Sequence, residues 1–236
     1  MKHPIELEII MPVYNEEDGI ASVILSISQE IGNRIRFRFV ISEDGSTDKT
    51  RAILQKLSRK VPMILLTESE RAGYSQGVLR ALRVSRAPFV CCVDSDGQYD
   101  PKDIWKLWNA RNKSDVVIGN RIMRRDSVFR VVMSRLFYYS FYFLFPKNIH
   151  DPSCSYILFR QEVARTLVNV LGLTNEGFWW EFMARVKQYG YSVREQRVSH
   201  FARQEGYTKI YSLVHLPKIV IQHVIAMVRV AKSRPA

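Results

Sequence analysis

The sequence has little cysteine. Its 236 residues include only Cys91, Cys92 and Cys154, and no CxxC pair or His/Cys spacing indicates a zinc site. Cys91 and Cys92 are neighbours in a strand-like run, so their side chains should point to opposite faces and cannot form an ordinary disulfide. We therefore expect three buried, free thiols in a reducing compartment.

The sequence also lacks a hydrophobic run long enough to span a membrane. The two best candidates, residues 136–145 and 219–228, fall well short of the roughly 20 residues that a spanning helix needs. Both are long enough to lie on a bilayer surface. Glu6 and Glu8 interrupt the first apolar run, which excludes a signal peptide.

Acidic residues are in the minority. Lys and Arg number 35 against 23 Asp and Glu, a formal charge of +12, and a hydrophobic content of 47% excludes a disordered chain. Nucleic acid, an anionic membrane surface and a phosphorylated small molecule all suit such a balance. No recognised nucleic-acid-binding motif is present, and the carboxylates described below would repel a polynucleotide, so we expect no nucleic-acid partner.

The first half of the chain alternates between two kinds of segment. Apolar, β-branched runs predict strands at 7–14, 37–42, 63–67, 89–93 and 115–118. Helical patterns separate them at 18–29, 47–59, 74–86 and 101–112. Two of these helices have start signals, Ser46-Thr47-Asp48 and Asp100-Pro101. The alternation predicts the α/β class: a single domain with a mostly parallel central sheet flanked by helices.

The second half has a different pattern. We expect helices at 161–170 and 177–189 and strands at 155–160 and 192–198. The segment 127–145 begins with arginines and continues as a run of Phe and Tyr, which suits a buried core and a membrane contact equally well. Residues 218–232 predict an amphipathic helix with Lys218, Gln222 and Arg229 on one face. Its other face carries Ile219, Ile221, Val224, Ile225 and Val228.

Acidic or polar clusters follow four of the predicted strands. They are PVYNEE at 12–17, SEDGSTD at 42–48, VDSDGQ at 93–98 and GNR at 119–121. The carboxyl ends of parallel strands meet at one edge of the sheet, and ligands bind there. A density of carboxylates at that edge of a basic protein indicates a divalent cation.

Asp94 and Asp96 are the strongest candidates for holding that cation. Residues that are two positions apart in an extended segment face the same way, so the two carboxylates should converge. They would repel each other unless a cation or a proton lay between them. Gly97 permits a tight turn, and Gln98 offers a further oxygen. Oxygen ligands suit Mg²⁺ or Mn²⁺. The alternative, a helix-capping role, is already filled by Asp100.

The four motifs, in this order and spacing, closely resemble family 2 glycosyltransferases, which have a GT-A (Rossmann-like) fold. More narrowly, DSDGQYDP (94–101), DPSCSYILFRQEV (151–163) and RQEGYTKI (203–210) resemble the dolichyl- or polyprenyl-phosphate sugar synthase branch. On this resemblance, residues 1–210 form the GT-A domain and residues 211–236 a C-terminal amphipathic helix.

The resemblance implies a role for each motif residue. The nucleotide-binding residues would be Pro12, Tyr14, Glu16, Asp44, Arg71, Gly73 and Asp94. The metal ligands would be Asp94, Asp96 and Gln98, and the catalytic set would be Asp94, Asp96, Arg121 and Asp151. The acceptor phosphate would meet Arg130, Ser134, Arg203 and Lys209. The family's usual Ser-Gly-Phe is replaced here by Cys154-Ser155-Tyr156.

The implied reaction is an inverting, metal-dependent transfer of a sugar from a GDP- or UDP-sugar to an acceptor. A polyprenyl phosphate is already an anion and needs no general base, whereas a hydroxyl acceptor would need a carboxylate, for which Asp151, Glu176 and Glu181 are candidates. A lipid acceptor implies peripheral contact with the cytoplasmic face of a membrane. The alternatives are a soluble transferase acting on a hydroxyl compound and a non-catalytic nucleotide-binding protein.

Overall fold

The computed structural model describes residues 4–122, 139, 141–145, 149–173, 177–201 and 216–233. Within them one sheet has the strand order β3-β2-β1-β4-β6-β5-β7. The strands are β1 (Leu7–Val13), β2 (Phe37–Glu43), β3 (Met63–Thr67), β4 (Phe89–Cys92), β5 (Val116–Ile122), β6 (Ile157–Arg160) and β7 (Val193–Ser199). The helices are α1 (Ile20–Ile31), α2 (Thr50–Leu57), α3 (Tyr74–Val84), the 3-10 turn η1 (Pro101–Asp103), α4 (Ile104–Ala110), α6 (Gln161–Leu167), α7 (Phe178–Gln188) and α8 (Leu216–Lys232).

The sheet is mostly parallel, as the alternating pattern predicts. β1 runs parallel to β2 and β4, β2 to β3, and β5 to β7. β6 is antiparallel to both of its neighbours, β4 and β5, so these two strands point the same way. The carboxyl ends of β1 to β5 and β7 therefore meet at one edge of the sheet, and the residues that precede β6 reach the same edge.

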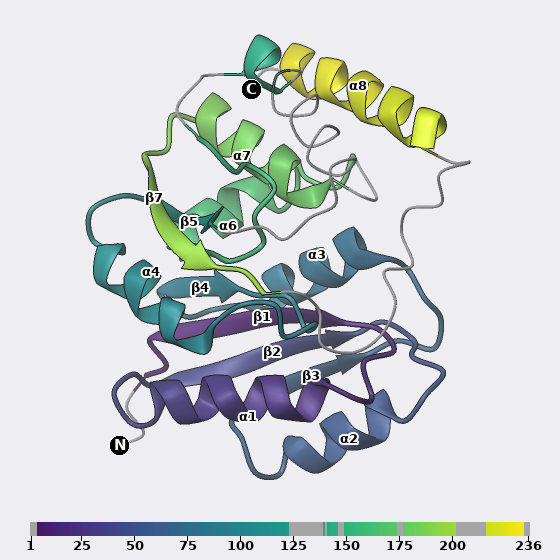
Figure 1. Ribbon diagram of the computed structural model, residues 1–236, viewed down its shortest axis with the longest axis vertical. Coiled ribbons are helices and arrows are strands. Elements are labelled where there is room, and N and C mark those ends of the chain that lie inside the picture. The colour runs from purple at the N-terminus through teal and green to yellow at the C-terminus, as the bar shows by residue number, and fades with distance from the viewer. Residues whose placement is uncertain are drawn as a thin grey trace.

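Helices cover both faces of the sheet. Figure 1 shows α1 and α2 on one side of β1 to β3 and α3 on the other. α1 packs against α2 and η1, whereas α3 contacts β1, β2 and α6, and α6 contacts α7. The central strand β1 is buried along its whole length, as expected for a strand covered on both faces. This three-layer arrangement of helices and sheet fixes the strand ends and hence the loops that follow them.

A buried carboxylate lies near the amino end of β1. Glu8 is fully buried, and its carboxylate accepts hydrogen bonds from the Arg38 guanidinium at 2.8 and 2.5 Å. The backbone amides of Arg86 and Ala87 donate to its other oxygen at 2.6 and 3.0 Å. A buried carboxylate is tolerated because each of its oxygens is satisfied. This edge of the sheet is thus held by structural polar contacts.

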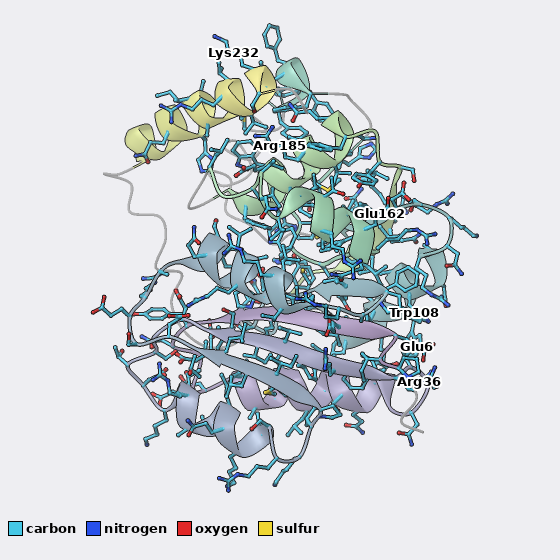
Figure 2. The ribbon with its side chains drawn as sticks, turned by 180° about the vertical axis from the view of Figure 1, so that it is seen from behind. Glu6, Arg36, Trp108, Glu162, Arg185 and Lys232 are labelled. Atoms are coloured by element: carbon cyan, nitrogen blue, oxygen red, sulfur yellow. The ribbon has the colours of Figure 1, made fainter. Side chains whose placement is uncertain are left out.

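A second, smaller core joins α7 to α8 and the short helical segment at 141–144. Its buried members are Phe141, Phe145, Trp180, Ala184, Ala226, Met227 and Val230. Arg185 of α7 adds a hydrogen bond at 2.9 Å to the carbonyl oxygen of Ser233, and Figure 2 shows it between the two helices. The C-terminal helix is therefore packed on the domain rather than free.

The buried side of α8 differs from the apolar face expected from the sequence. Val224, Ile225 and Val228 are 44%, 46% and 36% exposed, and Met227 and Val230 are buried instead. The small side chain of Ala226 allows close packing on α7, which leaves the bulkier branched residues outside. The side chains of Lys218, Ile219 and Ile221 lie outside the described residues.

The described part of the aromatic run at 137–145 divides between buried and exposed side chains, and the expected membrane contact stays a prediction. Phe141 and Phe145, four residues apart, are buried in the second core with ring centroids 4.9 Å apart. Tyr139 and Phe143 point the other way and are 67% and 89% exposed. Their neighbours Arg130, Ser134 and Arg135 lie outside the described residues.

The three cysteines are free and buried, as predicted. Burial raises the pKa of the Cys154 thiol to about 12 and raises those of Cys91 and Cys92 well above the ordinary value. We predict that none of the three reacts appreciably with a disulfide reagent such as DTNB at pH 8 in the native protein, because the thiols are buried and stay protonated. All three should react after unfolding in guanidinium chloride. Rapid labelling of even one thiol in the folded protein would contradict this prediction.

Candidate active site

The loop after β4 has the tight turn that the sequence predicts. Gly97 adopts φ +71°, a left-handed conformation that favours glycine, and the amide of Gln98 donates to Asp96 Oδ1 at 3.1 Å. Asp100 caps the following turn by accepting from the amide of Lys102 at 2.9 Å, with Pro101 at the first position. Asp100 thus fills the capping role, and neither Asp94 nor Asp96 is needed for it.

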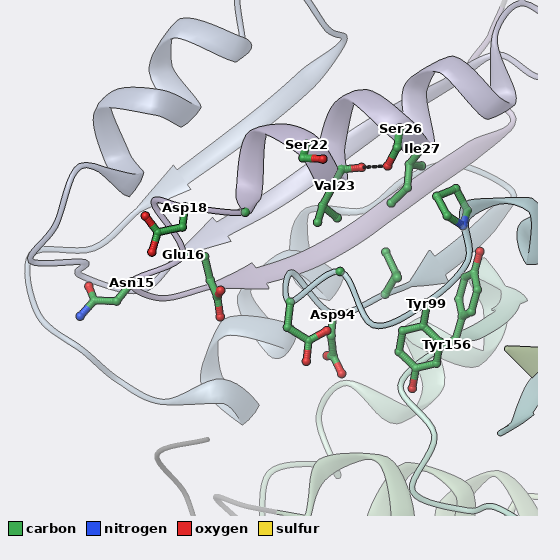
Figure 3. A pocket seen from close by; sticks show the side chains of 15 residues that line it. Asn15, Glu16, Asp18, Ser22, Val23, Ser26, Ile27, Asp94, Tyr99 and Tyr156 are labelled. Carbon is green, nitrogen blue, oxygen red and sulfur yellow. Dashed lines mark hydrogen bonds between the residues drawn. The ribbon is translucent and has the colours of Figure 1, made fainter. Parts of the chain in front are cut away.

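A cavity of about 270 Å³ lies beside this loop. Figure 3 shows Ser22, Val23, Ser26 and Ile27 of α1 along one wall, with Asp94 on the opposite side. The full lining comprises Asn15, Glu16, Asp18, Gly19, Ser22, Val23, Ser26, Ile27, Val93, Asp94, Asp96, Gly97, Tyr99, Pro101 and Tyr156. Both predicted metal-binding carboxylates therefore line one cavity at the carboxyl edge of the sheet.

The Asp94 carboxylate is fixed by hydrogen bonds to both of its oxygens. The Tyr74 hydroxyl donates to Oδ1 at 2.6 Å, and the Ser155 hydroxyl donates to Oδ2 at 2.5 Å. Ser155 also lies 3.1 Å from the Tyr99 hydroxyl. Each carboxylate oxygen has two lone pairs, so Asp94 keeps acceptor capacity on both oxygens.

The two carboxylates suit a hard divalent cation. Among the described residues, no three His, Cys, Asp or Glu side chains are grouped closely enough to hold a metal ion by themselves. Mg²⁺ does not require such a cage, because it keeps several waters and binds through one or two carboxylates together with substrate phosphates. Asp94 and Asp96 are the residues that would hold it. Gln98 does not line the cavity, and its side-chain amide donates to the carbonyl oxygen of Phe201 at 2.9 Å.

Asp44 lies where the loops after β2 and β3 meet. Its carboxylate accepts from the amides of Ala72 and Gly73 at 3.1 and 2.8 Å and from the Arg80 guanidinium at 2.5 Å. Gly45 allows these two loops to pack closely, because a Cβ there would stand 2.6 Å from the backbone of Glu70. Asp44 therefore organises the loop that holds Gly73. Its predicted contact with the nucleoside stays a prediction.

The predicted nucleoside-binding residues of the first motif lie at the end of β1. The Arg71 guanidinium stacks on the Tyr14 ring, 4.2 Å from its centroid, so the loop after β3 lies against the loop after β1. Glu16 lines the cavity, and its backbone amide donates to the Thr50 hydroxyl at 2.8 Å. Pro12 is buried in β1. The structure thus brings the first, second and fourth strand ends together.

Arg121 and Asp151 bind each other. Two nitrogens of Arg121 donate to the two Asp151 oxygens at 2.6 and 2.7 Å, and one of them also reaches the Ser153 hydroxyl at 2.8 Å. Burial alone would lower the pKa of Arg121, but the adjoining Asp151 carboxylate raises it well above its ordinary value. The pair is nearly buried, so each charge is matched locally and neither side chain is a free catalytic group in this arrangement.

The other candidate bases and acceptor residues have different positions. Glu181 is fully buried in α7, where its carboxylate accepts from the amide of Leu173 at 3.2 Å. Glu176, Arg130, Ser134, Arg203 and Lys209 lie outside the described residues, so their predicted roles stay predictions.

Three residues of this site could not be assigned from the sequence. Tyr74 and Ser155 lie 20 and 61 positions from Asp94, and no spacing rule joins them to it. Asn15 adopts φ +52° and bonds to Ser46 and Thr47, which locks the first two loops together. Asn adopts a positive φ more readily than most residues, so an Asn directly after a predicted strand was the sequence signal for this turn.

The chain matches a known protein family over most of the region that forms the sheet. The model of glycosyl transferase family 2 matches residues 8–168, which include the loops after β1, β2, β4 and β5. The chain belongs to glycosyltransferase family 2. This family membership confirms the resemblance that the four motifs indicate.

Individual relatives of this glycosyltransferase are distant. A dolichol-phosphate mannosyltransferase of Pyrococcus furiosus is 27% identical over 67% of this chain, and the match spans 47% of that protein. A dolichyl-phosphate hexose transferase of Haloferax volcanii is 28% identical over 87% of this chain and 86% of its own length. A dolichyl-phosphate beta-glucosyltransferase of Dictyostelium discoideum is 25% identical over 84% of this chain and 68% of its own length.

Solved structures confirm the GT-A fold. Glucosyl-3-phosphoglycerate synthase from Mycobacterium tuberculosis, in complex with Mn²⁺, UDP-glucose and phosphoglyceric acid, matches with a TM-score of 0.74. It is 17% identical, and the match covers 98% of this chain and 81% of that one. The same enzyme in complex with Mg²⁺ and UDP matches with a TM-score of 0.73 at 18% identity over the same shares. At these identities the likeness concerns the fold alone.

We predict that the Asp151→Ala substitution lowers the free energy of unfolding by about 3 kcal/mol, because it leaves the buried Arg121 charge without its partner. Urea denaturation measures the change. The control is Glu70→Ala, a carboxylate on the exposed surface, which should change stability by less than about 0.5 kcal/mol. Equal stability of the two variants would show that the Arg121–Asp151 pair is not a structural element.

Proposed function

We propose that this family 2 glycosyltransferase moves a sugar from a nucleoside diphosphate to a polyprenyl phosphate at a membrane surface, with inversion at the anomeric carbon. The observation that carries the proposal is the cavity at the carboxyl edge of the sheet, which Asp94 and Asp96 line together. The solved relatives of the same fold hold Mn²⁺ or Mg²⁺ and UDP.

The donor diphosphate needs positive charge at the bond that breaks. In the transfer, an acceptor oxygen forms a bond to the anomeric carbon while the bond to the diphosphate oxygen breaks, and the electron pair leaves on the diphosphate. A bound Mg²⁺ or Mn²⁺ supplies Lewis-acid stabilisation of that charge. Asp94 and Asp96 would hold the ion, and Arg71, whose guanidinium stacks on the Tyr14 ring at the same edge of the sheet, would add positive charge.

The acceptor is inferred from the state of the candidate bases. A hydroxyl nucleophile must lose a proton, whereas a phosphate monoester is already ionised at neutral pH. Asp151 is engaged by Arg121 through both oxygens, and Glu181 is fully buried with a backbone donor. Two of the three carboxylates that could serve as a base are therefore committed elsewhere, which favours an anionic nucleophile. The Pyrococcus and Haloferax relatives are named for dolichyl-phosphate chemistry, in agreement with this choice.

The membrane contact is inferred from exposed apolar side chains near the C-terminal helix. Val224, Ile225 and Val228 of α8 are exposed, and so is Phe143 beside the second core. Arg229 and Lys232 in the last turn add positive charge that anionic lipid would attract. No helix in the described part of the chain is long and apolar enough to cross a bilayer. Such a surface suits contact with a lipid–water interface.

A second acceptor class has one observation in its favour. The solved structures of similar fold bind phosphoglyceric acid, a soluble hydroxyl compound that carries a phosphate. A transferase acting on such an acceptor would use the same donor cavity and would not need the exposed face of α8. Transfer assays with each acceptor distinguish between the two classes.

We predict that UDP- or GDP-sugars raise the melting temperature only when Mn²⁺ or Mg²⁺ is present, and that Asp96→Asn lowers the transfer rate about 100-fold. Asp115→Asn, at the opposite edge of the sheet, is the control and should retain wild-type turnover. Transfer is measured in parallel to a polyprenyl phosphate and to 3-phosphoglyceric acid. Donor binding that neither EDTA nor Asp96→Asn changes would refute the metal-dependent mechanism. Transfer to 3-phosphoglyceric acid but not to the polyprenyl phosphate would show that the acceptor is the soluble compound and not the lipid.

We predict that the protein sediments with vesicles that contain anionic lipid, and that 0.5 M salt weakens this binding. Replacing Ile225 and Val228 by Glu should reduce the bound fraction at least about tenfold, because two apolar contacts are lost. Leu25→Glu is the control, since Leu25 is also exposed but belongs to α1, at the other end of the molecule in Figure 1. Equal binding to neutral and anionic vesicles at low salt would argue against this surface.

A further inference from the structure

A chain of hydrogen bonds joins α7 to the first carboxylate of the cavity. The Trp179 indole nitrogen donates to the Tyr74 hydroxyl oxygen at 2.7 Å, and that hydroxyl donates to Asp94 Oδ1 at 2.6 Å. Trp179 is the second residue of α7, and Tyr74 is the first residue of α3. The hydrogen bonds therefore link α7 and α3 to the loop after β4.

The direction of each bond in this chain is fixed by chemistry. An indole nitrogen can only donate, so the Tyr74 oxygen accepts from Trp179 and must use its own hydrogen on Asp94. The ring of Tyr74 is partly exposed, but its hydroxyl lies between Trp179 and Asp94. The hydroxyl is thus a permanent donor to the carboxylate.

The bond from Tyr74 and the bond from Ser155 reach different oxygens of Asp94. A carboxylate held at both oxygens cannot rotate about its Cβ–Cγ bond without losing one of them. The lone pairs left over therefore keep a constant direction, and Asp94 is one of the residues that line the cavity. Asp96, by comparison, accepts a hydrogen bond from within its own turn, from the amide of Gln98.

We propose that Tyr74 and Trp179 are positioning residues that hold Asp94 in the orientation needed to bind the metal-loaded diphosphate. This inference rests on the proposed function, because it assumes that Asp94 meets a metal ion there. Trp179 fixes the hydroxyl of Tyr74, and Tyr74 fixes the carboxylate. A carboxylate oriented in advance loses less freedom when the ion binds, so the two aromatic residues raise the affinity for metal and nucleotide without touching either.

The test compares Tyr74→Phe and Trp179→Phe with two matched controls. Both test variants keep a ring and delete a single donor. Tyr191→Phe deletes a hydroxyl that donates to Thr166 at 2.9 Å, and Trp105→Phe deletes an indole nitrogen that donates to Glu30 at 2.7 Å. Neither control residue lines the cavity. Calorimetric titration with UDP and with GDP is performed for each variant, once with Mn²⁺ and once with EDTA.

The expected result is specific to the metal. Tyr74→Phe should weaken Mn²⁺-dependent nucleotide binding about tenfold, the usual size of a lost hydrogen bond to a charged group, and Trp179→Phe should weaken it less. Binding in EDTA should be equal in wild type and variants, whether weak or undetectable, and both controls should bind like wild type. Equal weakening with and without Mn²⁺, or a lowered melting temperature with unchanged affinity, would overturn the inference. Failure of the wild type itself to bind either nucleotide with Mn²⁺ would instead refute the proposed function.

Discussion

Carboxylates that stand close together repel each other, and this constraint shapes the edge of the sheet on which the site is built. The parallel arrangement brings the ends of β1, β2 and β4 together, and each of them delivers acidic side chains. The chain resolves the repulsion in two ways. Asp44 and Glu43 are matched by Arg80 and Arg51, whereas Asp94 and Asp96 face a cavity. Asp94 and Asp96 on the cavity wall are the carboxylates that we propose meet a cation.

The matched pairs also limit what the rest of the edge can do. Arg121 and Asp151 both look catalytic when each is considered by its motif alone, yet in the structure each satisfies the other. The mutual ion pair draws the segment before β6 onto the end of β5. It brings Ser153 with it and sets the course of the chain toward Ser155, the second donor to Asp94. The pair thus contributes to the site by shaping it.

The fold was largely predictable from the sequence, because its elements are set by local patterns. Apolar, β-branched runs and helical patterns located each strand and helix of the first half, and capping residues such as Asp100 marked helix starts. The site was predictable as far as strand ends could be aligned, which placed Asp94, Asp96 and Glu16 together. The partners of those residues were not, because Tyr74 meets Asp94 through tertiary packing of α3 against the sheet. The buried side of α8 was also missed, since helical periodicity shows that a helix has apolar residues but not which of them its neighbour will cover.

Among the described strands β6 alone is antiparallel to its neighbours, and this has a consequence for how the protein is made. β6 stands between β4 and β5, and β5 pairs with β6 and β7, both of which follow it in the chain. As the chain leaves the ribosome, β1 to β4 can assemble early, whereas β5 has no place in the sheet until β6 has been synthesised. The donor from Ser155 and the ion pair of Asp151 arrive in that same late step. A nascent chain that ends before residue 160 would therefore hold half a sheet and a β4 edge without its partner strand. During this stage of synthesis, binding by a chaperone or self-association of the open edge would compete with completion of the sheet.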